Sequence, residues 1–352
     1  MQLPTGVTSR KISTARLQTH ILEHGDPSGE PVLLIHGNVS SNRFFDEVLA
    51  AMPANFYAIA PDLRGYGESE TKPVDATRGV QDWSEDIEAL IAALGLRGKK
   101  IHLLGWSLAG GIVLQYAIDH PQSMASLTLM APVSPYGFGG TKGADGQLVT
   151  EDGAGTGGGA ANPEFVRLVA NKEMGSDNQT SPRNVMNAFY FKPPFRVAAE
   201  VEDRLVASMN STAVGEDNYP GDMTASSHWP GVAAGNKGVL NSIVPTHFNV
   251  SHFAEIDPKP PVLWIRGDSD QIVSDASFFD LAFLGSLGAI PGWPGAELCP
   301  PQPMIAQTRA VLDRYQTNGG AYREVVFQNC GHSPHVEKQE EFLRTWVAFL
   351  GA

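Results

Sequence analysis

One serine in this chain stands where a reactive nucleophile could be held. Ser107 follows an apolar run, residues 101–104, that predicts a buried strand, and it precedes a run over 112–118 that predicts a helix. A serine on so tight a strand-to-helix turn projects from the edge of a sheet, and the strained backbone needs small neighbours. Small residues do flank it: Gly105, Ala109 and Gly110. The stretch therefore predicts a serine nucleophile for acyl transfer, although Gly-x-Ser-x-Gly here ends in alanine.

Such a nucleophile needs a base, a carboxylate that orients the base, and donors for the oxyanion. In a parallel sheet these groups sit on loops at the carboxyl ends of the strands, because those loops converge on one edge. His332 lies just past the last predicted strand and is the expected base. Asp268 and Asp270 both follow the strand that ends at Arg266. We favour Asp270 as the carboxylate and expect Asp268 to cap a turn.

Two backbone N–H groups are the expected oxyanion donors. Leu108 directly follows the serine, and Asn38 follows a His-Gly pair at the end of a neighbouring strand. The Asn38 side chain could also aim its amide into the site. Trp106, Tyr136 and Trp229 are the candidate substrate-binding side chains.

The elements around these residues predict a parallel α/β sheet. Apolar runs that read as strands alternate with segments of helical period, which is the pattern of strands covered by helices on both faces. The predicted strands cover two short pieces within 11–24, then 31–35, 56–60, 101–104, 125–130, 261–266 and 322–327. Helices are expected over 197–209, 276–284, 304–315 and 337–350, among others.

The alternation breaks after residue 132. Residues 137–160 hold roughly ten glycines and no apolar period, which predicts a flexible loop. Short helical pieces follow until the sheet pattern resumes near residue 261, and a Pro/Gly-rich insertion occupies 291–303. An interruption this long exceeds an ordinary loop. We therefore predict a core over 1–132, a cap over 133–258 and a second part of the core over 259–352.

The composition excludes several classes of partner. A net charge of −13 without a basic stripe disfavours nucleic acid and anionic membranes. No apolar run approaches the length of a membrane span, and residues 1–14 lack the apolar stretch of a secretory signal. Two cysteines cannot form a disulfide framework. We expect a cytoplasmic protein with a small-molecule substrate, and the oligomeric state, a homo-oligomer included, stays open.

No metal or cofactor is expected. The pair His247 and His252 lacks a third ligand at usable spacing. Three acidic residues in the glycine-rich segment are better explained by solvation than by Ca²⁺: Asp145, Glu151 and Asp152. We expect Cys330 to be a buried, packing thiol rather than a redox group.

Together these residues resemble the serine hydrolases of the α/β-hydrolase superfamily, of the esterase or lactonase kind. The order Ser107, Asp270, His332 along the chain is the order of that family's triad. Further matches are His36-Gly37, residues 61–69, Gly105-Trp106-Ser107, Gly267-x-x-Asp270, and Gly331-His332 followed by Glu337. The resemblance covers about 20–135 and 260–350. It implies an eight-stranded, mostly parallel sheet with a mainly helical cap inserted after the sixth strand.

The resemblance leaves several activities open. The first is hydrolysis of an ester or lactone of a bulky apolar molecule, because the cap holds many large apolar side chains of which some could roof a pocket. The second is carbon–carbon bond hydrolysis of dienone-type substrates, or cofactor-free perhydrolysis, on the same triad. The third is a non-catalytic receptor of this fold. The loop at Asn38 also resembles that of haloalkane dehalogenases, but those enzymes and the epoxide hydrolases use aspartate at the position of Ser107.

Overall fold

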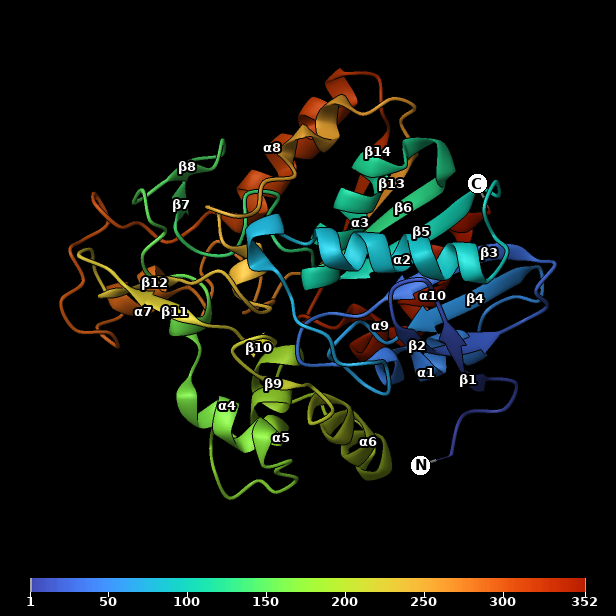
Figure 1. The fold of residues 1–352 in the computed structure, drawn as a ribbon, viewed down its shortest axis with the longest axis horizontal. Coiled ribbons are helices and arrows are strands. Elements are labelled where there is room, and N and C mark those ends of the chain that lie inside the picture. The colour runs from blue at the N-terminus through green and yellow to red at the C-terminus, as the bar shows by residue number, and fades with distance from the viewer. Residues whose placement is uncertain (1, 352) are drawn as a thin grey trace.

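A single sheet of eight strands forms the centre of the structure, a computed structural model that describes residues 2–351 (Figure 1). Its order is β1-β2-β4-β3-β5-β6-β13-β14. The strands are β1 (Thr8–Ser13), β2 (Gln18–His24), β3 (Glu30–Ile35), β4 (Phe56–Pro61), β5 (Ile101–Trp106), β6 (Met124–Met130), β13 (Val262–Gly267) and β14 (Tyr322–Phe327). Only the β1–β2 and β2–β4 pairings are antiparallel. The predicted eight-stranded, mostly parallel sheet is confirmed.

Burial explains why these segments form strands in this order. Every residue of β4 and β5 is buried, as expected for apolar runs covered on both faces. Strand β1 is almost wholly exposed, and its charged residues Arg10 and Lys11 suit an edge. Because the central strands are buried along their whole length, the residues predicted to do chemistry can reach a cavity only from the loops at the ends of these strands.

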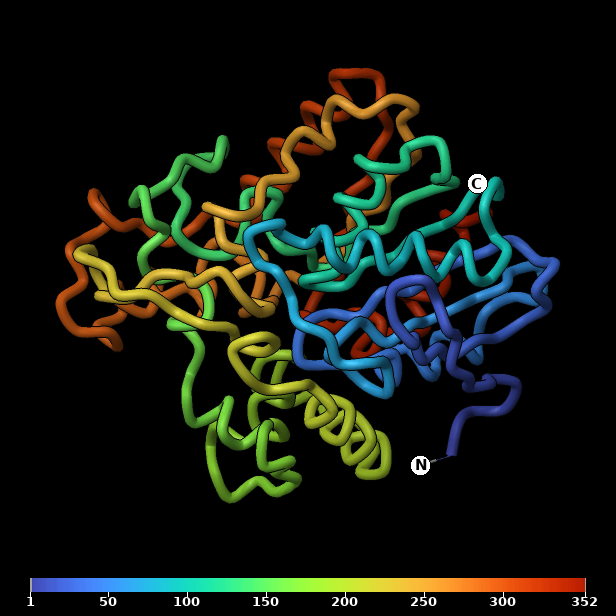
Figure 2. The backbone as a smooth tube through the Cα atoms, viewed as in Figure 1, coloured from blue at the N-terminus to red at the C-terminus, as the bar shows by residue number. Residues whose placement is uncertain are grey.

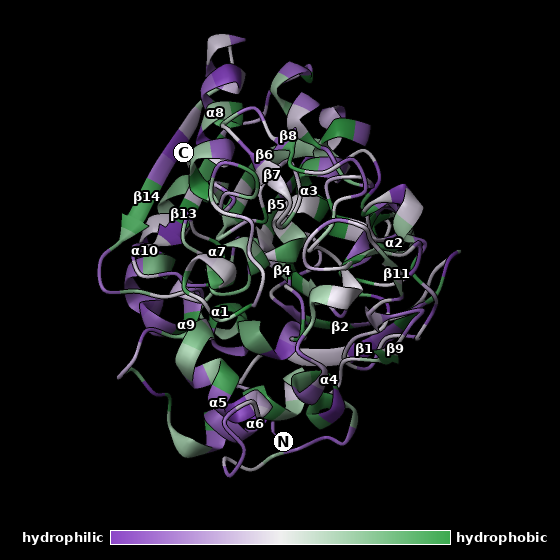
Figure 3. Ribbon diagram, turned by 90° about the vertical axis from the view of Figure 1, so that its left-hand side faces the viewer, coloured by the Kyte–Doolittle hydropathy of each residue, from purple (hydrophilic) through white to green (hydrophobic). Residues whose placement is uncertain are grey.

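Helices cover both faces of the sheet. Helices α2 and α3 lie in front of it in Figure 1, and α9 and α10 lie behind it. The indole of Trp346 in α10 donates a hydrogen bond to Thr128 Oγ1 of β6, at 3.1 Å. The helices of the core are α1 (Asp46–Ala50), α2 (Gln81–Ala93), α3 (Leu108–Asp119), α7 (Leu281–Ser286), α8 (Met304–Thr317), α9 (Pro334–Glu337) and α10 (Gln339–Leu350). Surface helices carry hydrophilic as well as hydrophobic residues (Figure 3).

The segment between β6 and β13 carries short helices and three small two-stranded sheets. Its helices are α4 (Pro163–Ala170), α5 (Pro182–Val185), a π-helical turn (Met186–Tyr190) and α6 (Ala199–Met209). The strand pairs are β7 (Thr141–Lys142) with β8 (Gln147–Leu148), β9 (Val214–Gly215) with β10 (Tyr219–Pro220), and β11 (Met223–Ala225) with β12 (Val232–Ala234). The domain boundaries at 132 and 258 stay a prediction.

The glycine-rich segment has defined structure. It contains the β7–β8 hairpin and a 3-10 turn, Gly158–Ala160. The backbone N–H of Gly139 donates to Gln302 Oε1 at 2.5 Å, and Gln302 Nε2 donates to Gly137 O at 3.0 Å. This side-chain amide therefore anchors a segment that has no apolar period to hold it in place.

The 291–303 insertion packs against the segment between β6 and β13. Figure 2 shows this segment folding back beside the residues around β11 and β12. The indole of Trp229 donates a hydrogen bond to Pro291 O at 2.9 Å. The preceding helix, α7, is shorter than predicted, because Asp280 caps it by accepting a bond from the Ala282 N–H at 3.0 Å.

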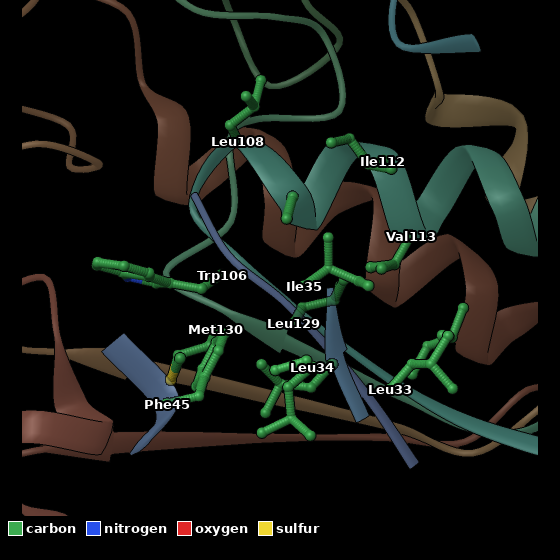
Figure 4. Close-up of a cluster of buried hydrophobic side chains, with 14 of the residues drawn as sticks. Leu33, Leu34, Ile35, Phe45, Trp106, Leu108, Ile112, Val113, Leu129 and Met130 are labelled. Carbon is green, nitrogen blue, oxygen red and sulfur yellow. The ribbon is translucent and has the colours of Figure 1, made fainter. Parts of the chain in front are cut away.

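The turn between β5 and α3 has the strained backbone expected for the reactive serine. Ser107 has φ 59° and ψ −121°. Its N–H donates to Met130 O at 2.9 Å, and its carbonyl accepts from the Val133 N–H at 3.0 Å. Figure 4 shows Trp106 and Leu108 leaving this turn in different directions above the packed strands β3 and β6. The turn is thus held by the neighbouring strand and displayed at the sheet edge.

None of the helices in residues 2–351 has the length and hydrophobicity that crossing a bilayer would need.

We predict that Gly105→Ala destabilises the protein by about 3 kcal/mol. A Cβ at residue 105 would lie 2.3 Å from Ala109 O and 2.6 Å from Val113 Cγ2, so β5 and α3 would have to separate. Urea unfolding measures the effect. Gly351→Ala is the matched control, because the nearest atom to its added Cβ is Val347 O at 3.7 Å. An unfolding midpoint of G105A equal to that of G351A would contradict this packing.

Candidate active site

The closest pair of candidate residues is His332 and Asp270. His332 Nδ1 lies 2.8 Å from Asp270 Oδ2, and both side chains are almost fully buried, at 2% and 3% exposure. The other carboxylate oxygen, Oδ1, accepts hydrogen bonds from the N–H groups of Ile272 at 2.8 Å and Val273 at 3.0 Å. The carboxylate is therefore fixed in place and presents one oxygen to the imidazole. That contact places the histidine proton on Nδ1 and leaves Nε2 as the basic nitrogen.

Asp268 has a different environment. Its Oδ1 accepts bonds from Ser269 Oγ at 2.8 Å and from the Cys330 N–H at 3.2 Å. Partial burial opposes ionisation of this carboxyl, but the bonds from Ser269 and from the backbone N–H groups of Asn329 and Cys330 lower its pKa. Asp268 thus holds a loop, and Asp270 is the acid that contacts the histidine.

Trp106 connects the serine turn to the histidine loop. Its indole N–H donates to the backbone carbonyl of His332 at 2.9 Å. The Trp106 ring also packs against the His332 ring, with centroids 5.7 Å apart. Because Trp106 directly precedes Ser107, this one side chain links the position of His332 to that of Ser107.

Ser107 and His332 line the same cavity, which has a volume of about 420 Å³. Among the described residues no hydrogen bond joins Ser107 Oγ to the His332 ring. The structure therefore brings Asp270 and His332 into direct contact, and it places Ser107 at the cavity that His332 lines. Hydrogen bonds between catalytic groups are often long in free enzymes and tighten in the substrate complex.

Both predicted oxyanion donors line this cavity too. Leu108 is the first residue of α3, so its N–H has no acceptor within the helix. The loop that carries Asn38 passes directly over the serine, since a Cβ at Gly37 would lie 2.8 Å from Ser107 Cβ. Asn38 Oδ1 accepts a hydrogen bond from Tyr66 Oη at 2.7 Å, which leaves the Asn38 amide N–H₂ as a donor.

Of the three candidate substrate-binding side chains, only Trp106 lines the cavity. Tyr136 and Trp229 lie outside the residues that line this cavity, and their roles in substrate binding stay predictions. Tyr136 packs under the β7–β8 turn, where a Cβ at Gly146 would lie 2.1 Å from its ring. Trp229 is turned toward the 291–303 insertion by its bond to Pro291 O.

Other aromatic residues form the cavity wall, and the sequence pattern did not mark most of them. Two are among the large apolar side chains of the predicted cap, Phe165 and Phe189. The others are Phe138, Tyr190, Tyr219, Phe278 and Phe279. The positions of Phe278 and Phe279 could have been predicted from the sequence. They follow Asp270 by only a few residues, so they must lie near the same edge of the sheet. No pattern marked Phe138, which lies in an irregular loop, or Tyr219, which lies in the two-residue strand β10.

A second Ser-His-Asp chain exists at the far edge of the sheet. Ser9 Oγ lies 2.8 Å from His20 Nε2, and His20 Nδ1 lies 2.6 Å from Asp62 Oδ2. Ser9 is exposed on strand β1, and none of the three residues lines the cavity of Ser107. The Asp62 carboxylate also accepts from the backbone N–H of Asn42 and Glu68. We therefore assign this chain to edge-strand structure.

Residues 2–351 contain no group of three or more His, Cys, Asp or Glu side chains placed to hold a metal ion. His247 Nδ1 lies 3.3 Å from Asn241 O. Asp152 accepts bonds from Ser226 Oγ and the Ala154 N–H, and Asp145 accepts from Gln147 Nε2. Burial raises the pKa of the Cys330 thiol well above its usual range.

His335 is a buried imidazole that sits beside the site. Its ring lies 4.8 Å from the Trp106 ring and 5.0 Å from the Phe45 ring. Neither of its nitrogens has a hydrogen-bond partner in the described residues. Burial, assisted by the neighbouring His332, lowers the pKa of His335 to about 3. The ring is therefore neutral and acts as an aromatic support on the far side of Trp106.

Residues 30–283 match the family model described as alpha/beta hydrolase fold, which is well over half of the chain. The chain belongs to the α/β hydrolase fold family.

Parts of this α/β hydrolase are similar to named relatives. Lipase 1 of Psychrobacter immobilis is 36% identical over 108 residues, which make up 31% of this chain and 33% of that protein. The 2-hydroxymuconate semialdehyde hydrolase of Pseudomonas sp. (strain CF600) is 32% identical over 124 residues, or 34% of this chain and 42% of that protein. The matches thus span less than half the length of either relative.

The whole α/β hydrolase is similar in fold to solved structures. One is described as a membrane phospholipase A and bacterial virulence factor; it has a TM-score of 0.62 and 20% sequence identity, with 98% of this chain and 86% of that chain covered. At such low identity the similarity shows the shared fold.

We predict that His335→Phe makes the stability of this hydrolase less sensitive to acid. The unfolded chain takes up a proton at His335 below pH 6.5, whereas the folded protein does not do so until about pH 3. The contribution of the neutral His335 to the free energy of unfolding is therefore fully present above pH 6.5. It falls as the pH drops below 6.5, by up to about 1.4 kcal/mol per pH unit. Urea unfolding of wild type and H335F at pH 7, 6 and 5 measures the difference. Parallel curves for the two proteins would contradict a buried neutral imidazole.

Proposed function

We propose that this α/β hydrolase is a serine hydrolase that cleaves a carboxylic ester or lactone of a small, bulky, uncharged molecule. The observation that carries the proposal is the His332–Asp270 contact beside the strained Ser107 turn, at one end of an apolar cavity. Acyl transfer needs this set of groups and no metal or cofactor. The similarity of one segment to a lipase supports the same chemistry.

In the first half-reaction, Ser107 Oγ forms a bond to the substrate carbonyl carbon while its proton passes to His332 Nε2. The Asp270 carboxylate stabilises the imidazolium through the 2.8 Å contact at Nδ1. The N–H groups of Leu108 and Asn38 hold the negative charge that develops on the carbonyl oxygen. Collapse of this intermediate breaks the ester bond, and the leaving alkoxide takes the proton from His332.

In the second half-reaction, His332 removes a proton from water, whose oxygen then bonds to the acyl carbon. The same donors hold the second oxyanion. Breaking the acyl–Ser107 bond returns the proton to Oγ and releases the acid. A lactone follows the same steps, except that the leaving hydroxyl remains attached to the acyl group.

The wall of the cavity indicates the class of substrate. Its aromatic residues come from both the core and the cap, and among the described residues no Lys or Arg lines it. Apart from His332 and the tyrosines, its ionisable side chain is Asp280, a buried carboxylate that accepts backbone N–H bonds at both oxygens. A negatively charged substrate group would therefore be desolvated without a partner.

The same observation weighs against carbon–carbon bond hydrolysis. That alternative has support from the 2-hydroxymuconate semialdehyde hydrolase similarity, and the name of that substrate denotes a carboxylate. A carboxylate inside this cavity would have no guanidinium or ammonium group to pair with. Ester hydrolysis needs no such group, so it fits the cavity better.

We predict that Ser107→Ala lowers kcat on any turned-over ester by about 10⁴-fold or more. Steady-state turnover on a panel of aryl esters and lactones measures the loss. Ser9→Ala is the matched control, because it removes the serine of the other Ser-His-Asp chain and should leave turnover unchanged. Full activity in S107A would refute the proposal.

We predict that adding a carboxylate to a good aryl ester substrate lowers kcat/KM by about 100-fold or more, because the charge is buried unpaired. The matched neutral compound is the methyl ester or amide at the same position. Equal kcat/KM for the charged and neutral compounds would show that a counter-charge is available and would favour the carbon–carbon hydrolase alternative.

A further inference from the structure

Glu337 is a buried carboxylate that touches both the histidine loop and the cap. Its Oε1 accepts a hydrogen bond from the Gly331 N–H at 2.8 Å, directly before His332 in the chain. Its Oε2 accepts from the Lys192 N–H at 2.8 Å, in the segment between β6 and β13. One side chain therefore joins two pieces of backbone that are about 140 residues apart.

The two pieces of backbone lie directly against each other at this point. A Cβ at Gly331 would lie 2.8 Å from Lys192 N and 2.9 Å from Phe191 C. Lys192 Nζ donates to Asn329 Oδ1 at 2.9 Å, so the lysine side chain is directed to the loop and not to Glu337. The carboxylate thus accepts hydrogen bonds from backbone N–H groups. Burial raises the pKa of Glu337, and these hydrogen bonds oppose the rise.

The cap residues just before Lys192 reach the reacting groups. Phe189 and Tyr190 line the cavity. The Tyr190 ring lies 5.9 Å from the Trp106 ring and 6.1 Å from the His332 ring. Its hydroxyl donates to the backbone carbonyls of Asn38 and Val39, each at 3.1 Å. A substrate that fills the cavity therefore presses on the same short segment that Glu337 ties to the histidine loop.

We propose that Glu337 is a positioning residue that couples the cap segment Phe189–Lys192 to His332, so that a substrate filling the cavity sets the position of the base. The inference rests on the proposed function, because it assigns the base role to His332. A displacement of about 1 Å in a catalytic group can reduce a rate about 100-fold. Loss of a hydrogen bond that positions His332 is therefore expected to lower kcat measurably.

Glu337→Gln tests the coupling. The amide keeps one acceptor oxygen but turns an N–H₂ group toward the second backbone N–H, so one of the two bonds is lost. Glu340→Gln is the matched control, since Glu340 is exposed on α10. Turnover is measured on two neutral esters with the same leaving group, p-nitrophenyl acetate and a bulky p-nitrophenyl ester that fills the cavity. Circular dichroism confirms that each variant is folded at the assay temperature.

The expected result is a fall in kcat of about 10- to 100-fold on the bulky ester, a fall at least about fivefold smaller on the acetate, and KM values within about threefold of wild type. E340Q should match wild type. Unchanged kcat in E337Q, or an equal fall on both esters, would overturn the coupling. If E337Q does not fold, Glu337→Asp, which keeps both acceptor oxygens on a shorter side chain, is judged by the same ratio. Absence of turnover in the wild type would instead be a failure of the proposed function.

Discussion

The strained turn at Ser107 is the constraint on which the rest of the site depends. A φ of 59° at a residue with a side chain is tolerated because β5 and α3 pack so closely that no alternative path is open. The same turn sets two further directions. It sends the Trp106 indole toward the His332 carbonyl, and it places the Leu108 N–H at the free start of α3. Three consecutive residues thus position the proposed nucleophile, the proposed base and one proposed oxyanion donor.

The cap and the core meet at the same place. Tyr190 of the cap contacts the rings of Trp106 and His332 and bonds to the loop of Asn38. Phe189 packs edge-on against Phe279, with ring centroids 5.2 Å apart, although Phe189 lies between β6 and β13 and Phe279 follows β13. Phe278 and Phe279 are 39% and 40% exposed, so they stand at the rim of the cavity. Under the proposed function, the aromatic contacts that shape the cavity would therefore also help to place the reacting groups.

Much of this arrangement could be predicted from the sequence, because it depends on local patterns. Buried strands can be recognised as apolar runs. The loops that follow parallel strands lie at one edge of the sheet, and this predicted that Asp270 and His332 are close together. The cavity wall could not be predicted in this way. Tyr136 and Trp229 are aromatic residues in the expected part of the chain, but loop packing turns them elsewhere, whereas Tyr219 reaches the wall from the two-residue strand β10. Likewise, no period reveals that Gln302 anchors the glycine-rich segment, because that contact is made by one buried amide.

The most direct measurement of the central claim is the site of reaction with a fluorophosphonate, found by mass spectrometry of peptides from the labelled protein. A serine activated by a neighbouring imidazole displaces fluoride and keeps the phosphonyl group. The account predicts one adduct per chain, on Ser107, and a much slower reaction in Asp270→Asn than in Asp268→Asn. An adduct on Ser9 or another residue, or an unmodified wild-type protein, would contradict it.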